Sequence, residues 1–202
     1  VSGHSTGLAS EIITLDINGN AKSERTHIDR DNSTVTILTA FADSSLEASQ
    51  TFVNGLLLTK TTGSVAEPIL YTYDALGRPA SETHPHHHDA PSIIAYVPSS
   101  NLILSETDPA GNSTTYSYHP DGQPGAGRIA VITNALNQNT YRSYSPRGEL
   151  TRTWGDTDYP VKYAYNDYGE RTAMTTYRTG DDDNLWTTST WPSPTPTGDT
   201  TT

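Results

Sequence analysis

The chain has 202 residues, a formal net charge of −11 and no cysteine, which excludes disulfides, thiolate metal ligands and cysteine nucleophiles. Such an acidic surface repels phosphate groups, so we expect no nucleic-acid partner. Hydrophobic residues make up 33% of the chain, below the roughly 45–50% of an ordinary globular domain. Apolar runs such as Leu56 to Leu58 are too short for membrane insertion.

The residue types favour strands and turns over helices. Twelve Tyr stand against two Phe, and the chain holds 15 Gly and 13 Pro beside many Thr. A Tyr ring supplies apolar area while its hydroxyl stays hydrated or hydrogen-bonded. We therefore expect a modest core that is built largely from Tyr.

Residues 1–50 predict a divergent, β-rich N-terminal segment. LDINGN, from Leu15 to Asn20, is typical of a turn. The stretch 29–34 begins like a calcium-binding loop, but Thr34 stands where that loop requires Gly and Ala40 where it requires a bidentate Glu. An EF-hand is therefore rejected.

Residues 51–180 contain an internal repeat. Aromatic anchors recur at steps of 23, 22, 26 and 21 residues, at Tyr73, Tyr96, Tyr118, Tyr144 and Tyr165. Four residues after each anchor stands a turn residue, namely Gly77, Ser100, Gly122, Gly148 or Gly169. Phe52 opens a weaker copy, FVNGL, that is one residue short.

Four of the five anchors close a short aromatic pair. Tyr71 precedes Tyr73 by two residues, as Tyr116 and Tyr163 precede their own anchors, so both rings of a pair leave the same face of a strand. The pair that begins at Tyr141 is one residue longer. These spacings predict a strand that ends at each anchor.

The residues after an anchor predict a tight turn. Asp74 or its counterpart closes the turn by accepting backbone hydrogen bonds, and Gly then supplies a positive φ before the return strand. We expect the arginines that follow three of these turns to lie across Tyr rings, at Arg78, Arg128 and Arg171.

A second turn is interleaved with the first. TDPAGN, with Asp108 and Gly111, is matched 24 residues earlier by the sequence SETHP and more loosely by residues 132–139. Each unit of about 22 residues therefore holds a strand, a turn, a strand and a turn. The predicted fold is all-β, a long antiparallel meander of hairpins in a curved, twisted sheet.

The motif YxYDxxGR at residues 71–78, with the companion TDPAGN, resembles the YD repeat, also called the RHS repeat. The resemblance covers about residues 50–180 and implies a scaffold role, because members of this family form β-sheets that spiral into shells, as in bacterial Rhs and toxin-complex proteins and in teneurins. The self-cleaving core of that family, a DPxGLxDG-like segment, has no match here. Autoproteolysis and a toxin payload are therefore not expected.

A histidine-rich stretch fills one companion turn. One interpretation is a Zn²⁺, Ni²⁺ or Cu²⁺ site in which imidazoles and a carboxylate converge, with the ligands His84, His86, His87, His88 and Asp89. The alternative is an exposed polar loop at the edge of the sheet. Successive residues of an extended loop point in different directions, which favours the second interpretation.

Residues 181–202 predict a Thr/Pro-rich linker or tail, because Pro prevents a strand ladder and Thr, Ser and Gly supply no core. Trp186 and Trp191 are expected to dock on the last strand.

No phosphate-binding loop, HExxH or GxSxG motif occurs, so we expect neither an enzyme nor a cofactor. The favoured function is a structural repeat segment of a secreted or cell-surface protein, bacterial by its composition. Its expected partners are neighbouring repeats or copies of the same chain, joined at sheet edges into a filament. The alternatives are a carbohydrate-binding module that stacks Tyr and Trp rings on sugars, and a metal protein centred on the histidine stretch.

Overall fold

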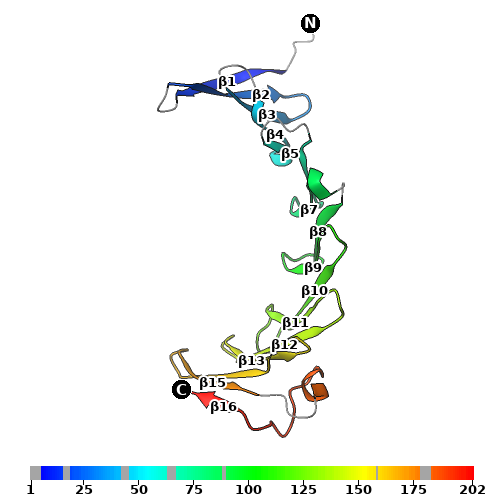
Figure 1. Cartoon of the computed structure of the whole chain (residues 1–202), viewed down its shortest axis with the longest axis vertical. Helices are drawn as coiled ribbons and strands as arrows, with labels where there is room; N and C mark the ends of the chain where they lie inside the picture. Colours follow the sequence, from blue (N-terminus) through cyan, green and yellow to red (C-terminus); the bar gives the residue numbers. More distant parts are fainter. Residues whose placement is uncertain are drawn as a thin grey trace. The chain divides into compact units, whose positions relative to one another are not determined.

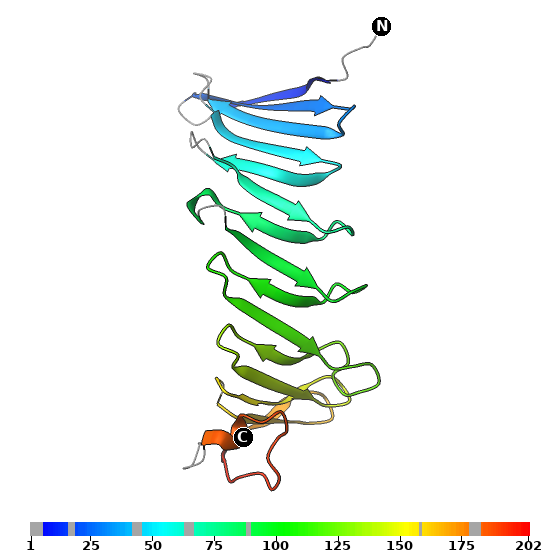
Figure 2. The same ribbon diagram turned by 90° about the vertical axis from the view of Figure 1, so that its right-hand side faces the viewer.

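The computed structural model describes residues 6–15, 19–41, 46–62, 67–87, 90–157, 159–177 and 183–202. Within these ranges the chain forms 16 strands, and the strand order in the sheet is the chain order from β1 to β16. Figures 1 and 2 show the back-and-forth course of the hairpins. The predicted all-β antiparallel meander is confirmed. The chain divides into two compact units, Val1–Ile94 and Ala95–Thr202.

The first unit consists of long N-terminal strands followed by shorter ones. The strands are β1 (Thr6–Leu15), β2 (Ala21–Asp29), β3 (Thr34–Phe41), β4 (Leu46–Val53), β5 (Leu56–Thr62), β6 (Ile69–Tyr73), β7 (Pro79–Thr83) and β8 (Pro91–Tyr96). The division between the units falls inside β8. A single-turn 3₁₀ helix, η1 (Pro85–His87), lies in the histidine-rich stretch.

The second unit repeats hairpins of five- and six-residue strands and ends in a short strand. The strands are β9 (Ile103–Thr107), β10 (Ser113–Tyr118), β11 (Ile129–Thr133), β12 (Asn139–Tyr144), β13 (Leu150–Gly155), β14 (Val161–Tyr165), β15 (Arg171–Thr176) and β16 (Asp199–Thr201). A 3₁₀ helix, η2 (Asp183–Trp186), precedes β16. No helix in the described part of the chain is long and apolar enough to cross a membrane.

The anchor strands alternate in exposure as a half-buried sheet requires. In β14, Val161, Tyr163 and Tyr165 are half-buried, whereas the intervening Lys162 and Ala164 are exposed. The same alternation occurs in β6 around its two tyrosines. Because successive side chains of a strand point to opposite faces, both rings of each Tyr-x-Tyr pair lie on one face.

A β-bulge follows each anchor turn in the hairpins whose register is known. The return strand inserts one extra residue opposite the strand end, at Ala80, Ala130, Thr151 and Thr172. A bulge of this kind follows from a turn that ends in a residue with positive φ. The β4–β5 hairpin differs because Asn54 and Gly55, with φ of 50° and 81°, form a two-residue loop. This explains why the copy at Phe52 is one residue short.

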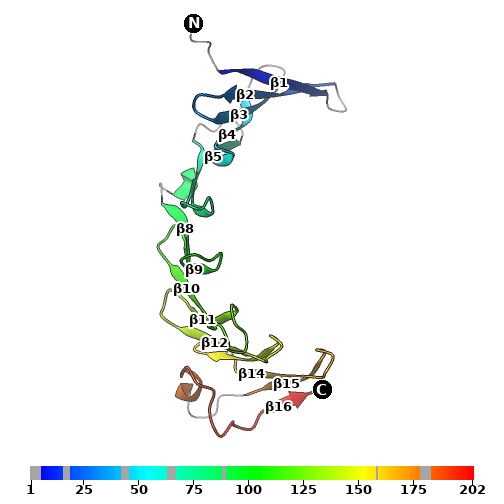
Figure 3. The same cartoon turned by 180° about the vertical axis from the view of Figure 1, so that it is seen from behind.

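The C-terminal segment differs from the expected linker or tail. Residues 183–202, orange to red in Figure 2, fold back against the last strands of the second unit. β16 pairs with β15 through Met174–Thr201, Thr175–Thr200 and Thr176–Asp199, and Figure 3 shows the two strands side by side. The prolines of this segment lie before β16, where no ladder hydrogen bonds are needed.

Candidate functional site

A repeated turn joins five pairs of successive strands between β6 and β15. In its five-residue form, the first residue receives hydrogen bonds at its side-chain oxygen from the backbone N–H groups of the third and fifth residues. Asn166 Oδ1 accepts from Tyr168 N at 3.0 Å and from Glu170 N at 3.0 Å. The backbone closes the ring, since Asn166 N donates to Glu170 O and Gly169 N donates to Asn166 O, both at 3.0 Å.

Three anchor turns and two companion turns have the same structure. The same four-bond pattern occurs in the turns that begin at Asp74, Asp108, Asn134, Ser145 and Asn166. The fourth residue has positive φ in all of them, and Asn137, with φ of 60°, replaces Gly in one. A unit therefore uses one turn type at both ends of its strands.

The side chains at the first and fifth positions of these turns have complementary hydrogen-bonding roles. Where the first residue is Asp, the fifth is a donor: Arg78 Nε donates to Asp74 Oδ2 at 2.7 Å, and Asn112 Nδ2 donates to Asp108 Oδ2 at 2.8 Å. Where the first residue is Asn or Ser, the fifth is an acceptor, as in the pairs Asn134–Gln138, Ser145–Glu149 and Asn166–Glu170.

The turn after Tyr96 departs from this pattern. Val97 N donates to Leu102 O, so the turn is one residue longer, and the positive φ of 56° belongs to Ser99 rather than to Ser100. Ser100 Oγ instead accepts from Leu102 N at 3.1 Å. The prediction that Ser100 replaces the turn glycine is therefore wrong, because the longer loop moves the strained position by one residue.

The anchor tyrosines tie successive hairpins together through their hydroxyl groups. Tyr165 donates to the carbonyl oxygen of Leu150 at 2.9 Å, Tyr118 to Ile103 at 2.7 Å, and Tyr73 to Leu57 at 3.0 Å. Tyr144 makes the corresponding bond to Ile129 at 3.2 Å. Each accepting residue is the first or second residue of a return strand one hairpin earlier. We call this bond the tyrosine latch.

The latches interlock. Leu150 is the Cα partner of Tyr144, and Ile129 is the Cα partner of Tyr118. A tyrosine therefore bonds the residue that pairs with the preceding anchor, across a bulge that leaves this carbonyl available. Burial raises the pKa of Tyr118 and Tyr165 above the ordinary value of tyrosine, which keeps both hydroxyls protonated as donors.

Tyr141 does not belong with the anchors. Tyr116 pairs with Ile132, and Ile132 pairs with Thr140, so these three side chains lie on one face of the sheet. Thr140 and Tyr144 therefore share the face of the anchors, while Tyr141 lies on the opposite face. There its ring stacks on Trp154 at a centroid distance of 5.6 Å. The Tyr-x-x-Tyr spacing is the cause, because residues three apart on a strand point to different faces.

Arg128 and Arg171 contact Tyr rings, as predicted. The guanidinium of Arg128 lies 5.7 Å from the ring centre of Tyr144, and that of Arg171 lies 5.6 Å from that of Tyr163. Arg78 pairs with Asp74, at 2.6 Å between Nη2 and Oδ2. This bonding lowers the pKa of Asp74, chiefly through the side-chain hydrogen bond from Arg78.

The histidine-rich stretch brings His84 close to a carboxylate. His84 Nε2 lies 2.7 Å from Glu82 Oε1, and its ring meets that of His87 edge-on at 6.0 Å between centroids. His86 is exposed, and His88 and Asp89 lie outside the described residues. Among the residues that the structure describes, no group of three or more His, Asp or Glu is arranged to hold a metal ion. The metal site stays a prediction.

A pocket of about 390 Å³ lies in the first unit around Tyr71 and Tyr73. The residues that border it include the cross-strand pairs Gln50–Lys60, Tyr71–Glu82 and Glu82–Ser92. Burial and then the charge of Glu82 raise the pKa of Tyr71. The pocket thus combines ring surface with a base, an acid, an amide and a hydroxyl.

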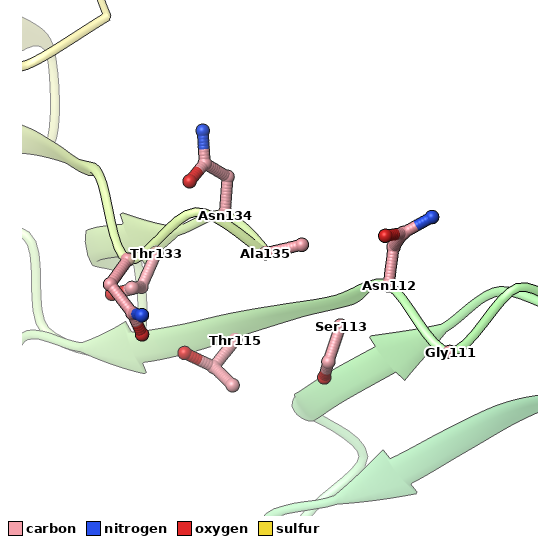
Figure 4. A pocket seen from close by; sticks show the side chains of 8 residues that line it. Gly111, Asn112, Ser113, Thr115, Thr133, Asn134 and Ala135 are labelled. Carbon is pink, nitrogen blue, oxygen red and sulfur yellow. The ribbon is translucent and has the colours of Figure 1, made fainter.

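A second pocket, of about 270 Å³, lies between two successive companion turns of the second unit. Figure 4 shows hydroxyl and amide groups along its walls, from Ser113, Thr115 and Thr133 and from Asn112 and Asn134. Its lining carries no charged group and no aromatic ring. Neutral donors and acceptors of this kind bind water or polar groups and do not favour either positively or negatively charged ligands.

Sequence reasoning missed the largest buried cluster of the described residues. Trp154, Tyr177 and Trp186 are only 5%, 4% and 3% exposed, and Tyr141 and Trp191 pack against them. The docking of Trp186 and Trp191 was foreseen, but their partner on β13 was not. The available signal was that all three tryptophans of the chain fall within residues 154–191.

Comparisons with known proteins give matches to solved structures alone. No family model matches the chain, and no curated protein matches it. The chain is similar to chains in three crystal structures: TcdB2-TccC3 without its hypervariable C-terminal region, TcdB2-TccC3-Cdc42, and TcdB2-TccC3. The identities are 16%, 16% and 15%, with TM-scores of 0.45, 0.45 and 0.46. The matches cover 83%, 94% and 94% of this chain and 9%, 9% and 10% of the others, so it spans about a tenth of their length.

Proposed function

We propose that the chain is a structural repeat segment, a scaffold of stacked hairpins within a secreted or cell-surface bacterial protein. The single observation that carries the proposal is the tyrosine latch, which joins each hairpin to the one before it at Tyr73, Tyr118, Tyr144 and Tyr165. Its regular recurrence fits a wall element, in which each unit supports its neighbours.

The turn chemistry supports the same role. Every five-residue turn satisfies its own backbone and side-chain groups internally, as Asn166 does with Tyr168, Gly169 and Glu170. Polar side chains whose hydrogen bonds are made within the turn stabilise the backbone conformation of that turn. Units built like this are stabilised by nearest-neighbour contacts and can be added or removed as modules.

A deletion series tests the proposal. Removal of residues 74–96, one anchor step of 23 residues, joins Tyr73 to Val97 and preserves the antiparallel alternation. We expect a folded chain with less β-structure by far-UV circular dichroism and unchanged tryptophan emission, because all three tryptophans lie in the second unit.

The matched control removes residues 74–84, about half a unit and one strand, which reverses the direction of every later strand relative to the earlier ones. This variant should aggregate or unfold. If the whole-unit deletion proves as damaging as the half-unit deletion, the units are not modular and the scaffold role is wrong.

Carbohydrate binding is a second candidate, which the pocket at Tyr71 favours. Its lining combines tyrosine rings, which stack on the apolar face of a sugar, with Lys60, Glu82 and Ser92, whose groups bond hydroxyls. A glycan array followed by calorimetry tests it. Tyr71→Ala should abolish binding, and Thr115→Ala, in the second unit, should leave it unchanged. No signal on the array would reject this candidate.

A further inference from the structure

The last strands of the second unit carry an aromatic face that is separate from the anchor tyrosines. Register places Tyr141 opposite Trp154, Arg152 opposite Lys162, and Lys162 opposite Thr175, so these side chains share the face that lacks the latches. Tyr177, just after β15, completes the surface and is 4% exposed. We call the surface formed by Tyr141, Arg152, Trp154 and Tyr177 the aromatic face.

Two tryptophans from residues 183–202 fill this face. The Trp191 ring meets Trp154 at 5.4 Å and Tyr177 at 5.3 Å, edge-on in both cases. The guanidinium of Arg152 lies 5.1 Å from the Trp191 ring centre. Trp186 contacts Tyr177 at 5.3 Å and Trp191 at 4.9 Å. Rings in such geometries gain energy beyond simple area burial.

Polar contacts fix the position of the segment on the face. Trp154 Nε1 donates to the backbone carbonyl of Thr188 at 3.0 Å, and Trp191 Nε1 donates to Thr195 Oγ1 at 3.1 Å. A backbone carbonyl is present in any peptide, so the first bond positions a chain without selecting a side chain. Both indole N–H groups thereby have hydrogen-bond partners.

The segment ends on the sheet edge through a close contact. β16 adds to β15 as a strand, and Gly198, just before it, approaches the backbone so closely that an added Cβ would lie 2.7 Å from Thr176 O and 2.7 Å from Thr175 Cγ2. Only glycine fits this place without displacing backbone. Strand addition to a sheet edge is an established way to bind a peptide.

From these contacts we infer that the aromatic face is a peptide-binding site for tryptophan-containing segments of the form W-x4-W-x6-G. In this structure, residues 186–198 of the same chain occupy it. All the described contacts come from residues beyond 182, so the same segment of a second copy makes them equally well. Covalent attachment raises the effective concentration of the segment and thereby favours the chain's own copy.

Cutting the full chain after it has folded tests the inference. A protease site placed within residues 178–182 allows residues 183–202 to be severed while the rest stays intact. We expect the severed segment to co-elute with the sheet at micromolar concentration and the tryptophan emission to stay blue-shifted. A dye-labelled synthetic peptide of residues 183–202 should then exchange into the site saturably, and the unlabelled peptide should displace it.

Variant peptides show which residues of the segment the binding site recognises. Trp191→Ala and Gly198→Ala should each weaken exchange by roughly tenfold or more, as expected for a buried aromatic anchor and a close backbone contact. Ser189→Ala, at an exposed position of the same segment, should bind as the parent peptide does. Loss of the segment on cutting, or equal uptake of the Gly198→Ala peptide, would overturn the inference.

Discussion

At the scale of single residues, the complementary pairs in the turns explain why the motif tolerates so many sequences. Asn166 receives two backbone N–H groups at Oδ1, so its Nδ2 faces the fifth residue as a donor and requires an acceptor there. Asp74 has two acceptor oxygens and takes Arg78 instead. Either arrangement satisfies the same turn.

Glu170→Lys should therefore destabilise the last anchor turn, since it sets a donor against the donor Nδ2 of Asn166. We expect a loss of about 0.5–1 kcal/mol in the free energy of unfolding, small because the pair is exposed. Adding Asn166→Asp should recover most of the loss, because it recreates the pairing of Asp74 with Arg78. Urea denaturation measures both. Glu170→Gln should be neutral, as Gln138 serves Asn134 in that way, and a large effect of this control would contradict the pairing rule.

Acid should weaken the turns that begin with Asp. Hydrogen bonds from Asn112 lower the pKa of Asp108, as the bond from Arg78 lowers that of Asp74. The folded state thus binds protons more weakly than the unfolded chain, whose Asp titrates near about 3.9. The stabilisation is present above that pH and is lost as pH falls through the lowered pKa.

Comparison of two chains isolates this effect. The urea midpoint of the wild-type chain should fall between about pH 5 and about pH 3. Asp108→Asn should show a smaller fall, because Asn keeps the turn, as at 134 and 166, and does not titrate. Parallel pH profiles for the two chains would show that Asp108 does not contribute.

At the scale of strands and hairpins, the latch decides how one hairpin is held on the next. Tyr165 bonds Leu150 fifteen residues earlier, at the opening of β13, while its ring stays half-buried on the anchor face. The bond is longer at Tyr144, at 3.2 Å, than at Tyr118, at 2.7 Å. Latches therefore differ in length along the sheet.

Tyr165→Phe should lower the free energy of unfolding by about 1 kcal/mol, because the carbonyl of Leu150 loses its donor while the ring packing is kept. Tyr168→Phe is the control, since Tyr168 is 87% exposed at a turn tip and should change stability by less than about 0.5 kcal/mol. Urea denaturation followed by circular dichroism measures both. Equal effects would mean that the hydroxyl of Tyr165 is not a latch.

At the scale of the whole molecule, each strand pairs with its neighbours in the chain, and the apolar core sits in the second unit. The described residues with the lowest exposure, Pro160, Trp186 and Tyr177, all belong to that unit. Stability in such a repeat array is a sum of nearest-neighbour terms, which permits different parts to unfold at different denaturant concentrations.

Unfolding should accordingly depend on the probe. Tryptophan emission reports on the aromatic cluster alone, since it contains all three tryptophans, whereas far-UV circular dichroism reports on all strands. We expect the emission transition in urea to lie at higher concentration than the dichroism transition. Coincident curves would show that the chain unfolds as one cooperative unit.

Much of this protein was determined by sequence alone because its fold is local. The spacing of the tyrosines specifies which face of the sheet their rings occupy. The turns are specified by an Asp, Asn or Ser followed by Gly. Strands that are neighbours in the sheet are also neighbours in the chain. The hairpin meander and the turns at Asp74, Asp108 and Asn166 could thus be predicted. The companion turn at Asn134 followed from the same signals, although Asn137 takes the place of Gly.

Tertiary structure decided what depends on contacts between distant residues. Trp154 and Trp191 are 37 positions apart, and no local pattern states that Arg152, Tyr177 and Gly198 meet around them. The same holds for the latch, because a bulge in one hairpin presents the carbonyl of Leu150 to the tyrosine of the next. Composition made residues 183–202 look like a linker, but burial of two indole rings outweighs the low strand propensity of the prolines around them.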